Sequence, residues 1–196
     1  MLLPVLVAAV LAMTVAGVAA VQGVLPGFTD RASTPPAAAP PATSPYSVKP
    51  PKKLSGLTLS NGSKAKQINA AFRSGGGFAD HPVTTFVYVD GHHDVRLYGG
   101  VVLTRMTAQD QRAFMAGATS SLSQDGQGIS VSTLSPVKAG TLGGTMRCAR
   151  LGTVPVSTEC VFADRGSAGV IVVLGRSGPA GVAKARATRE AVVHRH

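Results

Sequence analysis

The stretch from residue 142 to residue 174, LGGTMRCARLGTVPVSTECVFADRGSAGVIVVL, decides the fold that we expect for this chain. Three of its segments, at residues 146–150, 158–164 and 169–174, are short runs of mostly apolar or β-branched residues between turn residues. Such runs predict β-strands. Because the connections between them are short, we expect an antiparallel sheet rather than βαβ units.

The two cysteines of the chain, Cys148 and Cys160, lie in two of these predicted strands, on either side of a turn around residues 152–155. This placement favours a cross-strand disulfide, which would stabilise the fold by roughly 3 kcal/mol in the chain-entropy model. Exported proteins keep such bonds because no glutathione pool reduces them. A redox-active pair, a metal site and two unrelated thiols are the alternatives. Redox pairs usually have C-x-x-C spacing, and structural metal sites usually have four ligands.

The flanking segments add helices and further strands. Residues 63–73 and 107–122 have apolar residues at helical spacing, and Thr107 with Asp110 resembles a capping box. Residues 83–90 and 95–103 predict a hairpin that turns at Asp90-Gly91.

Two more elements complete the predicted order. Residues 129–134 alternate like a strand that Pro136 closes, and Gly178-Pro179 introduces a basic helix from residue 180 to about 193. The expected fold is therefore α+β, with an antiparallel sheet, packed helices and the order α-β-β-α-β-β-β-β-α. We expect one domain at residues 55–196, a length sufficient for a single hydrophobic core.

Residues 142–148, LGGTMRC, and 160–170, CVFADRGSAGV, resemble a motif of a large group of uncharacterised exported actinobacterial proteins. The group has an N-terminal span, a proline-rich linker and a C-terminal domain with the pattern LGG-x-M-x-C…C-x-[WF]-A-D. Trp is typical of that group at the position of Phe162, whereas this chain contains no Trp. The resemblance implies the same architecture and disulfide, and it implies no activity. Within the motif, we expect Asp164 and Gly169 to form a turn.

The first 25 residues contain no charged side chain and are long enough to cross the roughly 30 Å hydrocarbon layer as a helix. We expect a membrane anchor, and the alternative is a signal peptide cleaved near Ala20. Residues 26–54 are rich in Pro and Ala and predict a disordered linker, which would span on the order of 80 Å if extended. The linker and the cysteines favour export, although Lys and Arg are more numerous after the span than before it.

The formal net charge is +10, and residues 49–196 carry all of it. Outside the cell, the available polyanions are envelope polymers and lipid headgroups, so we expect weak attraction to them and no nucleic-acid partner. The candidate contacts on the last helix are Lys184, Arg186, Arg189 and Arg195. The alternative is a solvated basic face without a dedicated ligand.

No motif assigns a reaction or a cofactor. His92-His93, between Asp90 and Asp94, is the densest cluster of acid–base or metal-ligating groups, and an exposed turn explains it better than a metal site does. The sequence therefore predicts a membrane-tethered extracytoplasmic domain with a non-enzymatic binding or envelope-accessory role. The alternatives are an envelope hydrolase with a site near His92 and Asp94, and a sensor that acts through a membrane partner.

Overall fold

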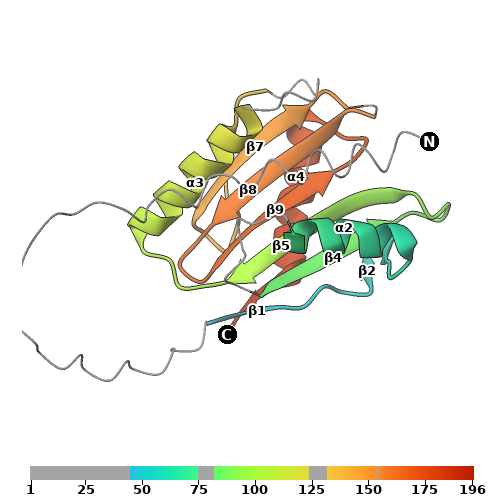
Figure 1. The fold of residues 1–196 in the computed structure, drawn as a ribbon, viewed down its shortest axis with the longest axis horizontal. Helices are drawn as coiled ribbons and strands as arrows, with labels where there is room; N and C mark the ends of the chain where they lie inside the picture. The colour runs from blue at the N-terminus through green and yellow to red at the C-terminus, as the bar shows by residue number, and fades with distance from the viewer. Residues whose placement is uncertain (1–44, 75–81, 124–131, 154) are drawn as a thin grey trace, which may run out of the picture.

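The computed structural model describes residues 45–74, 82–123, 132–153 and 155–196. This part of the chain is an α+β domain with one large antiparallel sheet, helices on both of its faces and a separate two-stranded ribbon (Figure 1). The predicted fold class is confirmed for these residues. The predicted span, residues 1–25, lies outside them, and none of the described helices is long and apolar enough to cross a membrane.

The sheet joins two sets of strands through the pair formed by β5 and β9. Its order is β2 (Lys53–Leu54), β3 (Leu57–Leu59), β4 (Val83–Val89), β5 (Val95–Leu103), β9 (Ser167–Val173), β8 (Ser157–Ala163), β7 (Thr145–Leu151) and β6 (Ser135–Val137). All neighbouring strands are antiparallel. The hairpin of β4 and β5 and the three strands β7, β8 and β9 confirm the corresponding predictions.

The sheet is buried on both faces. Helices α2 (Ser63–Ser74) and α3 (Ala108–Ser123) cover one face, and α4 (Gly178–Val192) covers the other (Figure 1). In β9, Val170 and Val172 belong to the core under α2 and α3, whereas Ile171 and Val173 belong to the core under α4. This alternation follows from the two-residue period of a strand. It explains why β8 and β9 are buried at every position.

The start of α3 has the predicted cap. Asp110 Oδ2 accepts hydrogen bonds from the backbone amide and the hydroxyl of Thr107, at 2.8 Å each. In return, Thr107 Oγ1 accepts from the backbone amide of Asp110 at 3.2 Å. Two otherwise unpaired amides at the helix N-terminus are thus satisfied, as in a capping box with Asp in place of Glu.

The ribbon consists of β1 (Tyr46–Val48) and β10 (Val193–Arg195), and the sequence analysis predicts neither strand. Strand β10 follows α4 directly, and Tyr46 pairs with Arg195. Composition predicts a linker up to residue 54, yet β1, β2 and the buried side chain of Tyr46 precede that boundary. The folded part of the chain therefore begins earlier than composition indicates.

The strand predicted at residues 129–134 is displaced along the chain. Residues 129–131 lie outside the described part, residues 132–134 are not in a strand, and β6 occupies Ser135–Val137. Pro136 lies within β6 instead of ending a strand. It is tolerated because β6 is an edge strand, where a missing amide donor leaves no partner unpaired.

The predicted disulfide between Cys148 and Cys160 is present. The two residues lie directly opposite each other in β7 and β8, with their Cα atoms 4.1 Å apart. Both side chains are buried in the core under α4. The bond therefore links the two strands from inside the packed layer.

Candidate functional site

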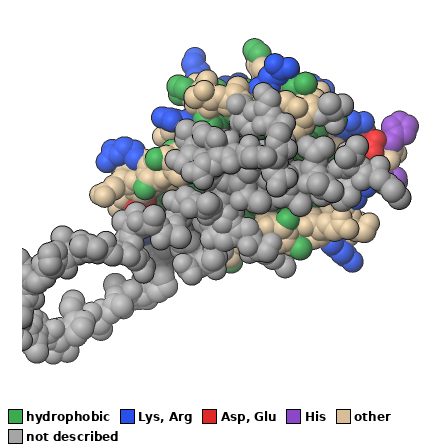
Figure 2. All heavy atoms as spheres, turned by 45° about the horizontal axis from the view of Figure 1, so that its top comes forward, with side chains coloured by type: hydrophobic (Ala, Val, Ile, Leu, Met, Phe, Trp, Pro, Cys, Tyr) green, Lys and Arg blue, Asp and Glu red, His purple; other side chains and the backbone are tan. Residues whose placement is uncertain are grey.

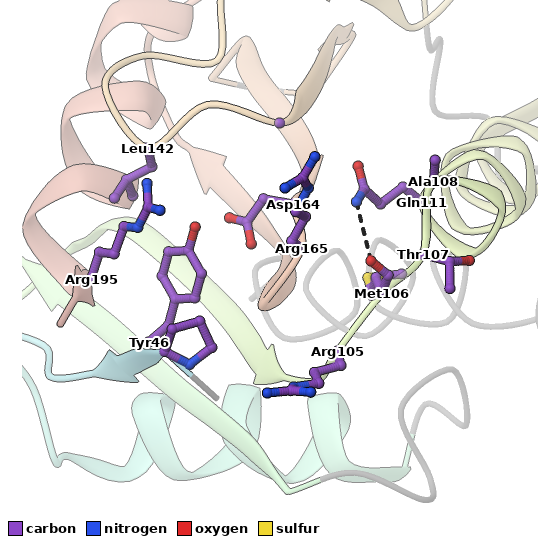
Figure 3. A pocket seen from close by; sticks show the side chains of 12 residues that line it. Tyr46, Arg105, Met106, Thr107, Ala108, Gln111, Leu142, Asp164, Arg165 and Arg195 are labelled. Carbon is purple, nitrogen blue, oxygen red and sulfur yellow. Dashed lines mark hydrogen bonds between the residues drawn. The ribbon is translucent and has the colours of Figure 1, made fainter. Parts of the chain in front are cut away.

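A pocket of about 820 Å³ lies at one end of the sheet, where three parts of the fold come together. These are the turn between β8 and β9, the segment between β5 and α3, and the β1–β10 ribbon. In Figure 3, Tyr46 and Arg195 lie on one side of this pocket, Met106 and Gln111 lie on the other, and Arg165 lies between them.

Three arginines line this pocket, which we call the arginine pocket. Arg105 follows β5, Arg165 lies in the turn between β8 and β9, and Arg195 ends β10. All three are exposed, and none forms an ion pair with another described residue. Cationic side chains from three distant parts of the sequence therefore meet around one cavity without local counter-ions from the described chain.

Backbone hydrogen bonds hold two of these arginines next to each other. The amide of Met106 donates to the carbonyl of Arg165 at 3.2 Å, and the amide of Thr104 donates to the carbonyl of Gly166 at 3.1 Å. These bonds fasten the segment that carries Arg105 to the turn that carries Arg165. The spacing of the two backbones is therefore fixed by the fold.

The ribbon positions Arg195 in a similar way. Arg195 pairs with Tyr46, and the amide of His196 donates to the carbonyl of Pro45 at 2.9 Å. The side chain of Tyr46 is only 7% exposed and belongs to the core under α4. The C-terminal strand is thus attached to the start of the folded chain, beside the pocket.

Asp164 is the acidic residue among the described residues that line the arginine pocket, and its charge is already balanced. Arg189 Nη2 donates to Asp164 Oδ2 at 2.6 Å, and both side chains are almost completely buried. Asp164 also accepts from the amides of Gly166 and Ser167 and from the hydroxyl of Ser167. It is therefore the turn-forming residue that the sequence predicts, and it does not cancel the charge of the three exposed arginines.

Arg189 itself has a structural role. It donates to the carbonyls of Ala139 and Gly143, and its guanidinium lies 4.7 Å from the centre of the Phe162 ring. Its prediction as a polyanion contact is wrong, because it is 0% exposed and its two terminal nitrogens already donate to Ala139, Gly143 and Asp164. The sequence could not show this, since its partners lie 25 to 50 residues away.

The other three predicted polyanion contacts do not form one patch. Arg195 lies in the arginine pocket, Lys184 lies in a different pocket, and Arg186 is half-buried close to Gly140. Arg105 and Arg165 were not predicted as contacts from the sequence: Arg105 lies in the connection between β5 and α3, and Arg165 lies in the motif at residues 160–170, which implies no activity. In the coloured part of Figure 2, Lys and Arg side chains likewise lie at several separate places on the surface.

Gly169, predicted to form a turn with Asp164, lies instead inside β9, opposite Phe162. A Cβ atom at this position would come within 2.8 Å of the Phe162 ring. Glycine is therefore required here for close packing rather than for a turn. Glycine inside a strand is a recognised signal of such a close approach.

The cluster at residues 90–94 forms a turn. Asp90 Oδ1 accepts from the amides of His92 and Asp94, and Asp90 Oδ2 accepts from Arg96 Nε at 2.6 Å. The hydrogen bond from Arg96 lowers the pKa of Asp90. Both histidines are exposed, and the described residues contain no group of three or more side chains that could hold a metal ion. The carboxylate of Asp90 thus organises the turn.

A buried carboxyl group lies on the opposite face of the sheet from Arg189. Glu159 is 0% exposed, and neither of its carboxyl oxygens has a hydrogen-bond partner among the described residues. Burial raises its pKa to about 8. The sequence analysis does not single out this residue, because a Glu in a strand is ordinarily placed on a solvated face.

The chain matches no protein-family model, no curated protein and no solved structure.

Proposed function

We propose that this protein is a membrane-tethered extracytoplasmic domain that binds phosphate or carboxylate groups of the cell envelope in the arginine pocket. The observation that carries the proposal is the meeting of Arg105, Arg165 and Arg195 around one cavity, while the acidic lining residue, Asp164, is already paired. The proposed role is binding without chemical conversion of the ligand.

The chemistry of the pocket suits oxyanions. A guanidinium group presents several N–H donors in a plane and binds carboxylate or phosphate in a bidentate manner. The pocket also has apolar surface, from Leu142, Met106 and the ring of Tyr46, which lowers the local dielectric and strengthens attraction to an anion. A ligand with a charged group and an adjoining apolar part fits this lining best.

The position of the pocket fits a domain that is tethered to the membrane through its N-terminal end. Pro45 and Tyr46, the first described residues, line it, so the linker predicted from the sequence would enter the domain beside the arginines. An anchor at residues 1–25 would tether this entry point, through the linker, to the outer surface of the membrane. Envelope polymers and lipid headgroups both offer the required anionic groups there.

Binding can be measured with the full chain in nanodiscs. In one arm, the lipid is phosphatidylcholine and fluorescent polyphosphate is added in solution. In the other arm, the nanodisc contains phosphatidylglycerol and protection of the arginine pocket is followed by hydrogen exchange. The test variant is R105Q/R165Q/R195Q, and the control is K53Q/K66Q/K138Q, which removes the same charge from exposed sites outside this pocket.

We expect the test variant to lose at least about tenfold in affinity for its ligand, because each charge-assisted contact contributes roughly 1.5–3 kcal/mol before screening. The control variant should bind almost like the native chain. Signal in the first arm alone identifies a soluble polymer as the source of the anion, and signal in the second arm alone identifies the lipid headgroup. Equal losses in both variants, or no binding in either arm, would refute the pocket as the site.

A further inference from the structure

A second basic pocket, of about 310 Å³, lies at the other end of β9. Arg165 of the arginine pocket precedes β9, whereas Leu174, Gly175 and Arg176 of this second pocket follow it. Arg165 and Leu174 lie on either side of the seven-residue strand β9, which spans about 23 Å. They are therefore distinct sites on the same sheet.

The charges in the second pocket do not balance. Four ionised side chains line it, namely Asp90, Arg96, Arg176 and Lys184. Asp90 and Arg96 form an ion pair with each other at 2.6 Å. Arg176 and Lys184 form no ion pair with any described residue, so two cations are left without a counter-ion in the described part of the chain.

These two cations are close enough to influence each other. The pKa of Lys184 is lowered, first by partial burial and second by the positive charge of Arg176. Lys184 is half-buried and Arg176 is exposed. Like charges that lie close together repel each other, and an anion between them would offset that repulsion.

The backbone around the second pocket is well fixed. Thr158 Oγ1 donates to the carbonyl of Arg176 at 3.0 Å, and the amide of Leu174 donates to the carbonyl of Arg96 at 2.9 Å. Helix α4, which carries Lys184, packs so tightly on β8 that a Cβ at Gly181 would come within 2.8 Å of Thr158 Cβ. The backbone segments that carry Arg176 and Lys184 are therefore held in place by the packed sheet and by helix α4.

We propose that Arg176 and Lys184 form a second anion-binding site, which holds a single phosphate or carboxylate group. A volume of this size is near the lower limit of ligand pockets, about 300 Å³, and suits a small anionic group better than a large ligand. Arg176 offers a planar donor pair, and Lys184 offers a compact ammonium group. This proposal does not rest on the function proposed for the arginine pocket.

The test uses the isotope-labelled full chain in non-ionic detergent micelles, titrated with inorganic phosphate at constant ionic strength. We expect saturable changes in the backbone amide signals of residues 174–184. R176Q and K184Q should each weaken phosphate binding at this site about tenfold. The control K66Q removes one positive charge from an exposed position on α2 and should bind like the native chain.

A second measurement needs no variant. Saturating phosphate should raise the pKa of Lys184 in the native chain, and binding should weaken at high pH, where Lys184 loses its proton. Linear, non-saturating changes, or an unchanged pKa of Lys184, would overturn the proposal. The same spectra contain separate signals for Arg105 and Arg165. Absence of phosphate binding at the second pocket can therefore be distinguished from absence of binding at the arginine pocket.

Discussion

Glu159 and Arg189 are both fully buried, on opposite faces of the sheet, and their surroundings differ. Arg189 on α4 has a carboxylate and two carbonyls as acceptors. Glu159 on β8 lies on the face under α2 and α3, because it alternates with Cys160 on the other face. A charged carboxylate without partners in such a place is strongly unfavourable, so the neutral acid is the stable form.

This difference predicts a pH dependence of stability. The pKa of Glu159 is raised to about 8 in the folded chain, so folding favours the protonated acid. The contribution of Glu159 to the free energy of unfolding should therefore be highest below the unfolded-state pKa of about 4.5 and should fall as the pH rises towards 8. The decrease is at most about 1.4 kcal/mol per pH unit. Urea unfolding of the native chain and of E159Q, at pH 5.5 and pH 7.5, measures it.

E159Q has no proton to lose, so its stability should change less between these two pH values than that of the native chain. E190Q is the matched control, because Glu190 is only half-buried at the surface of α4 and accepts hydrogen bonds from Thr141. A native chain and an E159Q variant that lose the same free energy over this interval would contradict the prediction.

At the scale of single elements, α4 is attached to the sheet by one buried ion pair as well as by apolar packing. Arg189, in the last turn of α4, reaches the turn between β8 and β9 through Asp164 and the loop before β7 through Gly143. Because the same turn carries Arg165, the pair also positions one edge of the arginine pocket. Asp164 and Arg189 thus position this edge of the arginine pocket through the backbone of the turn.

We expect D164N to destabilise the domain by about 3 kcal/mol, because it leaves the buried guanidinium of Arg189 without a counter-ion. The same substitution in the Asp90–Arg96 pair, D90N, should cost much less, since the side chain of Arg96 is 41% exposed and remains solvated. Thermal or urea unfolding of the two variants gives the comparison. Similar losses in both would show that burial does not control the strength of these pairs.

At the scale of the whole molecule, the two ends of the described chain lie together. Strand β1 pairs with β10, and in Figure 1 the C-terminus lies beside β1. The arginine pocket is at this end of the sheet, and the Arg176–Lys184 pocket is at the other. The domain therefore presents one basic site beside the predicted linker and another away from it.

The expected location of the domain outside the cytoplasm can be tested in living cells. Lys66 is exposed on α2, so a cysteine introduced by K66C should react with a membrane-impermeant maleimide in intact cells. The physical reason for this expectation is the buried disulfide, which is typical of oxidising compartments. Gel shift of the labelled chain is the measurement.

The native chain is the control for this experiment, since its cysteines are paired and buried and should not react in intact cells. A cytoplasmic protein with an exposed cysteine should react only after lysis. Labelling of K66C that likewise requires lysis would place the domain in the cytoplasm and would rule out the proposed envelope function.

The elements whose signals are local could be predicted from the sequence. The period of apolar residues predicts α2 and α3, the β-branched runs predict the β4–β5 hairpin and strands β7 to β9, and the spacing of Thr107 and Asp110 predicts a cap. The disulfide could also be predicted from the sequence, because two adjacent strands joined by a short turn bring Cys148 and Cys160 together. Each of these inferences depends on residues that are close in sequence.

Which charged residues are buried, and which meet at a pocket, is visible only in the folded domain. Nothing local distinguishes Arg189 from Arg186 or Arg195 on the same basic segment, yet one is buried against Asp164 and another lines the arginine pocket. Likewise, β1 and β10 are three residues each, too short to be recognised without each other. The physical reason is that burial, ion pairing and edge pairing depend on partners that approach only when the chain has folded.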